Sequence, residues 1–406
     1  MPEPLDLKRL KVYPLAERRS LSAIEKILVD PDKAPASCQA DVQSLIRGCA
    51  EKIRAARQRD AGVILMYGAH LVKNGAQRIV NALVSNGWIT HLATNGAGTI
   101  HDWELAFLGR TEENVRDNVA TGTFGTWDET GRYLQLALLA GALREEPLNP
   151  GQENQAASTS TNAGTTSPSP IGWERAGVRA GVQGEGYGCS LGRFITEDGV
   201  TLPTTMALEA ALREQPAHPL SPARAELLQT MLVHKLSGGR IEVKHPWKDT
   251  SILTQAFQHN TPFTVHPGIG YDIIANHPMF NGAAIGRAAE MDFRVLGGSV
   301  ERLDGGVVLS VGSAIMAPQV FEKSVSCVNN LRLQTGKKIL HDHTMYVVDI
   351  QDSGNWDWSR GEPPKDNPAY YLRFCKSFSR MGGEMKYVQC DNVTFLHQVL
   401  AALPKN

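Results

Sequence analysis

Short segments that are apolar throughout alternate with amphipathic segments over most of this chain of 406 residues. The segment 62–67 (GVILMY) is one example, and residues 39–57 before it repeat apolar side chains at helical spacing. Apolar segments of strand length recur at 89–93, 262–266, 306–311, 345–350 and 385–390, with helical patterns between them. Strands that are apolar on both faces and separated by helices are typical of a parallel sheet covered on both sides. The sequence therefore predicts an α/β fold with one parallel sheet and helices on both faces.

One internal segment has a different composition. Residues 148–188 are rich in Ser, Thr, Gly, Asn and Pro, and residues 167–186 resemble a translated bacterial intergenic repeat. Such a segment has too few apolar side chains to offset the entropy of ordering. It predicts a disordered insertion within one α/β domain that consists of residues 1–147 and 189–406. A linker between two domains would need a separate core on each side, whereas the strand pattern indicates a single core.

Charge, hydropathy and cysteine spacing exclude several classes of protein. The formal net charge is -1, so the chain as a whole is not attracted to nucleic acid or to an anionic membrane. No apolar run approaches the roughly 18–20 residues that span a bilayer, and the first residues contain no secretory signal. The six cysteines are scattered without a C-x-x-C pair. We therefore expect a cytoplasmic protein with reduced thiols that binds neither nucleic acid nor membrane.

Polar and glycine residues follow nearly every predicted strand. In a parallel sheet these loops share the carboxyl edge, where ligands bind, so together they predict a cleft. Gly96 and Gly98 would let a ligand approach the backbone closely, although a tight strand-to-helix turn explains them equally well because no G-x-G-x-x-G fingerprint is present. The loops are 67–75, 94–102, 265–282, 311–314, 349–358 and 389–392.

Several of these loops resemble, in the same order, those of the deoxyhypusine synthase family. The segment 94–102 keeps the family's Thr94, Gly98 and Asp102, and the segment 305–318 resembles its strand and glycine-rich cofactor turn. Near the end of the chain, Asp391 stands where the family has an acid that contacts the cofactor. The resemblance implies a Rossmann-like fold, NAD as the cofactor, a small-molecule substrate and a homo-oligomer, usually a tetramer.

The same resemblance assigns cofactor contacts to the loops after the strands. An enzyme of this type would be an NAD-dependent transferase or oxidoreductase. The residues expected to contact NAD are Ala69, His70, Thr94, Asn95, Gly96, Gly98, Asn281, Gly312, Ser313, Asp349, Asp352 and Asp391.

The catalytic lysine of the family, which forms a covalent imine, is replaced. The best match to its segment is Tyr370–Arg373, which places Arg373 at the position of the lysine. Arginine remains protonated and cannot form an imine, so only Lys376, three residues further on, is left as an alternative. Acids of the family are also lost, because His101 and Arg287 stand in their places. A polyamine needs carboxylates, so we expect a small substrate that is not a polyamine and no synthesis of deoxyhypusine.

The remaining polar residues of the loops suggest roles in the chemistry. His101, next to Asp102, is the predicted acid–base group, and its structural alternative is a hydrogen-bonded histidine at a helix start. Arg373 is the third predicted catalytic residue. With Arg287 it would suit a carboxylate or phosphate, although each arginine alone is more readily explained by a salt bridge. The predicted substrate contacts are Arg287, His266 and Asp357.

Two further hypotheses remain open. A metal-dependent hydrolase could use histidine and aspartate side chains that follow the strands, although none of them matches a recognised ligand spacing such as H-E-x-x-H. A non-catalytic binding protein could have kept the fold after losing the lysine. The residues of the hydrolase hypothesis are His101, Asp102, His266, Asp272 and His277.

Overall fold

The computed structural model describes residues 3–144 and 184–404. Its central sheet has the strand order β10-β9-β8-β2-β3-β7, and all neighbouring strands are parallel. This arrangement confirms the predicted α/β fold. The strands are β2 (Val63–Tyr67), β3 (His91–Thr94), β7 (Phe263–Val265), β8 (Val307–Val311), β9 (Thr344–Asp349) and β10 (Glu384–Gln389).

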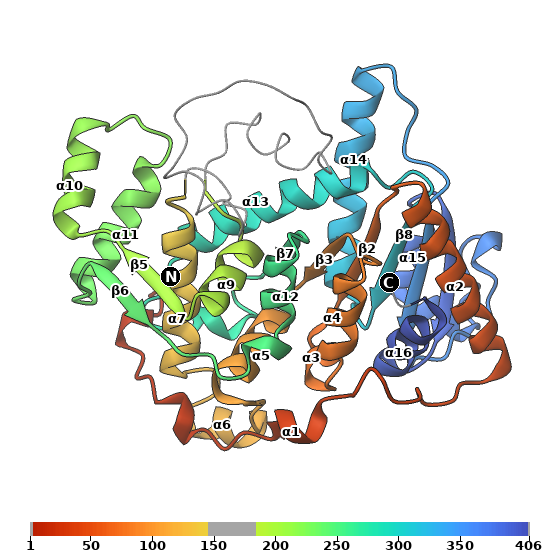
Figure 1. Ribbon diagram of the computed structural model, residues 1–406, viewed down its shortest axis with the longest axis horizontal. Helices are drawn as coiled ribbons and strands as arrows, with labels where there is room; N and C mark the ends of the chain where they lie inside the picture. Colours follow the sequence, from red (N-terminus) through yellow and green to blue (C-terminus); the bar gives the residue numbers. More distant parts are fainter. Residues whose placement is uncertain (1–2, 145–183, 405–406) are drawn as a thin grey trace.

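Helices lie on both sides of the central sheet (Figure 1). Successive residues of the central strands belong to two different apolar cores. In β2, Leu65 and Tyr67 belong to the larger core, whereas Ile64 and Met66 belong to the second core. Because side chains alternate across a strand, a central strand with helices on both faces must be apolar throughout. The larger core includes α2 (Ala40–Gln58), α4 (Gln77–Ser85), α5 (Gly96–Leu108) and α16 (Asn392–Ala402), and the second includes α13 (Gly282–Glu301), α14 (Met316–Gln334) and α15 (Arg373–Phe378).

The chain between β3 and β7 builds a further layer beside the sheet (Figure 1). A third apolar cluster, with Leu136, Leu202 and Leu227, joins its helices to the antiparallel pair β5–β6. The elements of this layer are α7 (Asp128–Gly141), α9 (Tyr187–Thr196), β5 (Gly199–Leu202), α10 (Thr205–Glu214), α11 (Ser221–Val233), β6 (Gly239–Glu242) and α12 (Ile252–Gln258).

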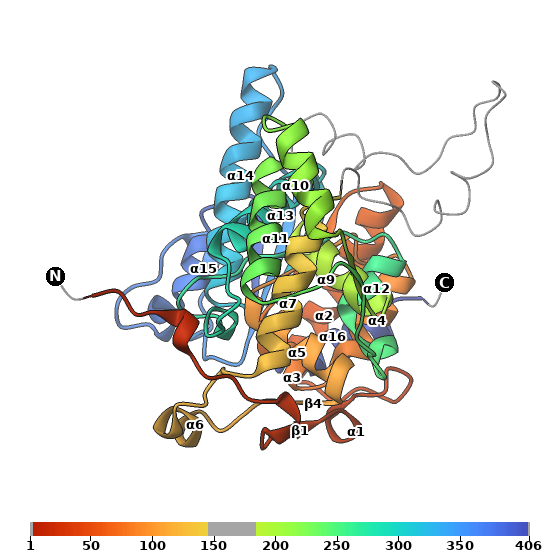
Figure 2. The same ribbon diagram turned by 90° about the vertical axis from the view of Figure 1, so that its left-hand side faces the viewer.

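Short elements complete the chain. Figure 2 shows the N-terminal segment with β1 and α1 running along the side of the molecule that also carries β4 and α6, and β1 pairs with β4. Within the described ranges, no helix is both long and apolar enough to cross a lipid bilayer. The short elements are β1 (Ser22–Ala23), α1 (Ile24–Ile27), α3 (Ala69–Lys73), β4 (Arg110–Thr111), α6 (Val115–Thr121) and 3-10 helices at Leu7–Arg9, Leu15–Glu17, Lys248–Thr250, Ile273–Ala275, Trp358–Arg360 and Pro368–Tyr371.

The predicted insertion at 148–188 extends too far at its C-terminal end. Residues 148–183 lie outside the described part of the chain, but residues 184–188 belong to the folded domain. Tyr187 begins α9 and is fully buried, and the Gly188 N–H donates to the Asp292 carboxylate at 3.1 Å. A Cβ atom at Gly188 would overlap the carbonyl oxygen of Phe263 in β7. Glycine here permits close packing, which composition alone does not distinguish from disorder.

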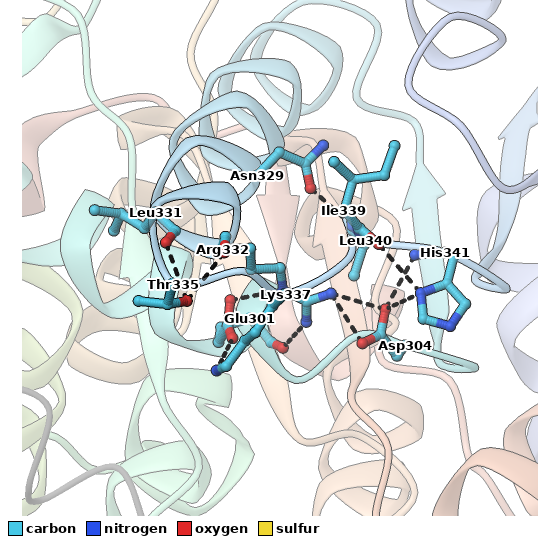
Figure 3. A network of polar contacts seen from close by, with 10 residues as sticks. All are labelled: Glu301, Asp304, Asn329, Leu331, Arg332, Thr335, Lys337, Ile339, Leu340 and His341. Carbon is cyan, nitrogen blue, oxygen red and sulfur yellow. Dashed lines mark hydrogen bonds and ion pairs between the residues drawn. The ribbon is translucent and has the colours of Figure 1, made fainter.

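A network of ion pairs joins the elements at the amino edge of the sheet (Figure 3). Arg332 of α14 is only 5% exposed, and its Nε donates to Glu301 at 2.9 Å while its Nη1 donates to Asp304 at 2.9 Å. Asp304 also accepts from the backbone N–H of His341 at 3.0 Å. Partial burial favours a higher pKa for Asp304, but the bonds from Arg332 and His341 hold this pKa below its ordinary value. The network therefore connects α13, α14 and the segment before β9.

Replacing Arg332 by Met should lower the free energy of unfolding by about 1–3 kcal/mol, because two carboxylates lose a charged donor. Lys337→Met is the matched control, since its ammonium is exposed and pairs with the same Glu301 at 3.3 Å. The control should lose less than about 1 kcal/mol. Urea unfolding of both variants measures the difference, and equal losses would contradict the role assigned to Arg332.

Candidate functional site

The sheet reverses its direction of growth between β2 and β8. From β2 the chain continues to β3 and β7 on one side, and from β8 it continues to β9 and β10 on the other. In open α/β sheets, ligands bind beyond the carboxyl ends of the strands at such a reversal. The candidate site is therefore the carboxyl edge of the sheet at this reversal, where Gly68 leads into α3 with His70 and the loop after β8 carries Gly312–Ile315.

The backbones of these two loops lie in direct contact. The Gly68 N–H donates to the Val311 carbonyl at 3.1 Å, and a Cβ atom at Gly68 would overlap the carbonyl oxygen of Gly312. Gly312 has a φ of +59°, and a Cβ atom there would overlap the side-chain amide of Asn392. Both positions thus need glycine for close packing within the protein. This packing brings the carboxyl ends of β2 and β8 and the start of α16 together.

Three carboxylates predicted to contact a cofactor lie on the same edge of the sheet. Each uses one oxygen to hold its own loop, because Asp349 accepts from Gln351 N at 3.1 Å, Asp352 from Gly354 N at 2.8 Å and Asp391 from Thr394 N at 2.9 Å. Within the described residues, no hydrogen bond or ion pair engages their second oxygens. The three carboxylates can therefore accept hydrogen bonds from hydroxyl groups of a ligand.

Exposed apolar and polar atoms accompany these carboxylates. Ile315, after β8, is 73% exposed, and Ile350, after β9, is 71% exposed. His70 is exposed beside Gly68. The predicted contact Ser313 is buried, and its hydroxyl oxygen accepts from Ala317 N in the first turn of α14 at 3.2 Å. The side-chain oxygen of Asn392 is buried without a hydrogen-bond partner in the described chain. The edge thus offers acceptors and apolar contacts side by side.

The predicted cofactor loop after β3 is filled by the protein itself. The carboxylate of Asp272 lies against Gly96, where a Cβ atom would overlap it, and accepts from Gly268 N at 2.7 Å. A bond from Ala97 N also reaches this carboxylate, while burial raises its pKa to about 6. Gly98 packs on Thr94, whose hydroxyl donates to the Tyr67 carbonyl at 2.9 Å. The glycines here permit a tight strand-to-helix turn, which is the alternative that the sequence offers to a cofactor-binding loop.

Two other predicted cofactor contacts cap helices. Asn95 accepts from Gly98 N at 3.0 Å at the start of α5, and Asn281 accepts from Ala283 N and Ala284 N at 3.0 Å at the start of α13. Such side chains satisfy backbone donors that a helix leaves unpaired. The amide oxygens of Asn95 and Asn281 are therefore engaged by the fold.

Asp102, a predicted catalytic residue, has a structural position instead. It is 1% exposed and accepts hydrogen bonds from the Ser251 hydroxyl at 2.6 Å, from Ile252 N at 3.0 Å and from Leu253 N at 3.1 Å. Burial raises the pKa of Asp102 to about 6. The carboxylate holds the start of α12 against α5, and both of its oxygens are engaged in doing so.

His101 belongs to a buried chain of hydrogen bonds. Its Nδ1 lies 2.7 Å from the hydroxyl oxygen of Thr111, and this hydroxyl donates to Glu104 at 2.6 Å. Because the Thr111 proton points to Glu104, the His101 Nδ1–H must be the donor in the first bond. Glu104 in turn forms a two-point ion pair with Arg18, at 2.7 and 2.9 Å. Burial lowers the pKa of His101 to about 4, so the ring is neutral at pH 7.

His266, a predicted substrate contact, belongs to a second buried chain. Its Nε2 lies 3.1 Å from the Thr264 hydroxyl, which lies 2.9 Å from the Nε2 of His91. The Nδ1 of His91 lies 2.8 Å from the Ser299 hydroxyl on α13. Burial lowers the pKa of His266 to about 4 and that of His91 to about 3. These neutral rings link β3, β7 and α13. The sequence does not predict this role for His91, because the residue lies within an apolar strand.

The two arginines predicted to bind one anion are held by different parts of the fold. Arg287 of α13 forms an ion pair with Glu226 of α11 at 2.6 Å. Arg373 is exposed at the start of α15 and lies 5.0 Å from the ring centroid of Tyr370. The structure gives Arg287 the salt-bridge role named as its alternative, and the clamp of two arginines stays a prediction.

The remaining predicted residues are engaged near the surface. Asp357 is exposed and accepts from Ser359 N at 3.0 Å. Lys376, the alternative to the missing lysine, forms an ion pair with Glu362 that lowers the pKa of this carboxyl. An ammonium held in an ion pair would have to be released and deprotonated before it could form an imine.

The residues of the metal hypothesis are distributed over separate contacts. His277 lies 3.2 Å from Asp128 of α7, whereas His101, Asp102 and His266 belong to the networks described above. Among residues 3–144 and 184–404, no group of three or more His, Cys, Asp or Glu side chains is arranged to hold a metal ion.

Two hollows in the described surface lie away from the reversal point. One of about 520 Å³ is lined at the amino edge by Lys52, His343 and Glu384, among others. The other, of about 240 Å³, is lined by residues that include Arg18 and Trp247. Neither hollow lies at the carboxyl edge, where the sequence predicts a cleft.

Replacing Gly68 by Ala should lower the free energy of unfolding by about 1–3 kcal/mol or more, because a backbone oxygen cannot move aside. Gly286→Ala is the matched control, since nothing lies within 4 Å of a Cβ atom at this position in α13. The control should stabilise the protein by roughly 0.5–1 kcal/mol. Chemical denaturation of both variants decides the matter, and an unchanged Gly68→Ala protein would disprove the close contact.

Replacing Arg18 by Leu should cost about 3–5 kcal/mol, because Glu104 is left as a buried, unpaired charge. Burial favours a higher pKa for Glu104, but Arg18 holds this pKa below its ordinary value of 4.5. The stability from this pair is therefore present above about pH 4.5 and is lost as the pH falls through the folded-state pKa.

Denaturation curves at pH 7 and pH 4 measure this linkage. The difference between wild type and Arg18→Leu should shrink at pH 4, and the double variant Arg18→Leu/Glu104→Leu should recover part of the loss. A difference independent of pH would refute the coupling.

No protein-family model matches the chain, and no curated protein matches it. Similar solved structures include ArgZ, an arginine dihydrolase of cyanobacteria, at 12% identity, a TM-score of 0.38 and 89% coverage of this chain. AgrE with ornithine and NAD+ has 13% identity, a TM-score of 0.37 and 91% coverage. This chain spans 32% of the length of the ArgZ chain and 34% of that of the AgrE chain.

A conserved putative LOR/SDH protein from Methanococcus maripaludis S2 has 12% identity, a TM-score of 0.41 and 92% coverage, and this chain spans 73% of its length. None of these three proteins is a deoxyhypusine synthase. All three TM-scores lie below 0.5, so the fold assignment rests on the strand order and not on these likenesses.

Proposed function

We propose that this chain is an NAD-dependent enzyme that acts on a small substrate at the carboxyl edge of the sheet. The observation that carries the proposal is the strand order. Read from β7 to β10, it is the 3-2-1-4-5-6 order of dinucleotide-binding Rossmann folds, with the reversal between β2 and β8. This argument is an analogy at the level of the fold, so the residues at the edge must also suit the cofactor.

The side chains at this edge fit a dinucleotide in two ways. Asp349, Asp352 and Asp391 each have an oxygen available to accept a bond from a ribose hydroxyl, and the exposed Ile315 and Ile350 offer apolar contacts to a ring. These acids follow β9 and β10, in the second half of the fold. A Rossmann fold with the glycine fingerprint takes its ribose-binding acid about 20 residues after the fingerprint. Here β3 ends at the neutral Thr94 and is followed by the neutral Asn95. Bound NAD would supply a hydride acceptor.

The acid–base group is proposed to be His70 in place of His101. His70 is exposed at the reversal point, beside Gly68. The Nδ1–H of His101 is committed to Thr111, and its pKa is lowered to about 4. A group that exchanges protons with a substrate must reach it, which favours His70.

The relationship to the deoxyhypusine synthase family is proposed only with a changed chemistry. Arg373 cannot form an imine, and Lys376 is paired with Glu362. The substrate is therefore proposed not to be a polyamine. Incubation of the protein with spermidine, NAD and a protein acceptor should give no aminobutyl transfer, and a labelled product would overturn this part of the proposal.

Calorimetric titration of the full chain with NAD+ tests the cofactor, with binding expected at sub-millimolar concentration. Asp391→Asn and Asp349→Asn should each weaken binding by about tenfold or more, because a charged acceptor is lost. Glu209→Gln on α10 is the control and should bind like wild type, since Glu209 is an exposed carboxylate in another layer. Absence of binding at millimolar NAD+ would overturn the proposal.

A further inference from the structure

Two cysteines that are far apart in the sequence lie together at the carboxyl edge. The Sγ atoms of Cys38 and Cys390 are 3.9 Å apart, although 352 residues separate them. Cys390 directly follows β10 and is 9% exposed, whereas Cys38 lies in the segment before α2 and is partly exposed. Both thiols are free.

We propose that Cys38 and Cys390 are a redox modification site, a dithiol that closes reversibly to a disulfide. Closure requires the sulfur atoms to approach from 3.9 Å to a bond length of about 2.0 Å. A movement of this size is within reach of side-chain rotation and a small shift of the N-terminal segment.

Hydrogen bonds hold the two cysteines in position. Gln43 of α2 donates to the Cys38 carbonyl at 3.0 Å, and Gln398 of α16 donates to the Ala36 carbonyl at 2.7 Å. On the other side, Cys390 N donates to the Asp349 carbonyl at 3.0 Å. The segment that carries Cys38 is therefore held on α16 before any disulfide forms, and hydrogen bonds fix the position of its thiol next to Cys390.

The chemistry needs an oxidant, which we assign to a low-molecular-weight disulfide such as oxidised glutathione. The Cys38 thiolate attacks one sulfur of this disulfide, the sulfur–sulfur bond breaks, and one glutathione thiolate leaves. The Cys390 thiolate then attacks the Cys38 sulfur and displaces the second glutathione. The two protein thiols lose two electrons and two protons, and one glutathione disulfide is reduced to two thiols.

The roles of the two cysteines follow from their surroundings. Cys38 is the partly exposed thiol and meets the oxidant first. Burial, with the nearby Cys38, raises the pKa of the Cys390 thiol to about 12, so little of it is thiolate at pH 7. Closure therefore relies on the position of the Cys38 sulfur, 3.9 Å away, and not on an activated Cys390 thiolate. Disulfides of this kind in a reducing compartment are transient.

The disulfide would fasten the N-terminal segment to the edge that holds the candidate site. Cys390 is followed by Asp391, which caps α16 and is a proposed cofactor contact. A bond across so long a loop removes much entropy from the unfolded chain, so oxidation should raise the melting temperature. The pairing of the thiols does not depend on NAD binding, and disulfide formation and NAD binding are measured in separate experiments.

The test treats the native full chain with oxidised glutathione, blocks remaining thiols with an alkylating reagent after denaturation, and measures the intact mass. The oxidised wild type should take two fewer labels than the reduced protein, and proteolytic mapping should recover a peptide that links Cys38 to Cys390. The melting temperature should rise by several degrees on oxidation and return with dithiothreitol.

Matched variants make the result specific. Cys327→Ser removes an exposed thiol on α14 and should still lose two labels on oxidation. Cys38→Ser and Cys390→Ser should lose none to an internal disulfide, and their melting temperatures should not respond to oxidation. A full set of labels in the oxidised wild type, stable glutathione adducts without a linked peptide, or a link between other cysteines would each overturn the proposal.

Discussion

The packing of the Gly68 backbone on the Gly312 backbone determines how the carboxyl edge of the sheet is built. It lies where the chain changes sides of the sheet, between β2 and β8, so any side chain there would push two central strands apart. The segments that begin at these glycines carry His70 in α3 and Ile315 before α14, and the start of α16 packs against Gly312 through Asn392. The positions of His70 and Ile315 therefore depend on two residues without side chains.

The sequence predicts the sheet well because its signal is simple. A strand between two helical layers must be apolar on both faces, and each of the six predicted strands overlaps an observed strand. The strand order could not be predicted in this way, because hydropathy does not record which strands are neighbours. The predicted insertion extends a few residues too far along the chain. The glycines near Tyr187 permit close packing, but by composition they resemble those of a disordered segment.

The candidate site could be predicted only in part, because contacts with distant parts of the chain decide which side chains are available. The sequence places polar residues at the correct edge, but it does not reveal their partners. Asp102 and Asn281 prove to cap helices, and Arg287 pairs with Glu226 on a helix far away in the sequence. The space beside Gly96 at the start of α5, where the sequence predicts a cofactor, is occupied by the carboxylate of Asp272, about 175 positions further along the chain. Tertiary partners of this kind are invisible to local patterns, whereas Asp349, Asp352 and Asp391 keep an available oxygen because their caps are local.

The burial of Asp292 and the packing of Gly188 also have a consequence for association between molecules. β7 is the last strand on its side of the sheet, and such a strand normally presents unpaired backbone groups to other chains. Here the Val265 N–H donates to Asp292 at 2.7 Å, and the start of α9 packs on the Phe263 carbonyl through Gly188. These two outward backbone groups of the short strand are thereby engaged within the chain. They are not available to a strand of a second copy, so any contact between copies at this part of β7 would use side chains.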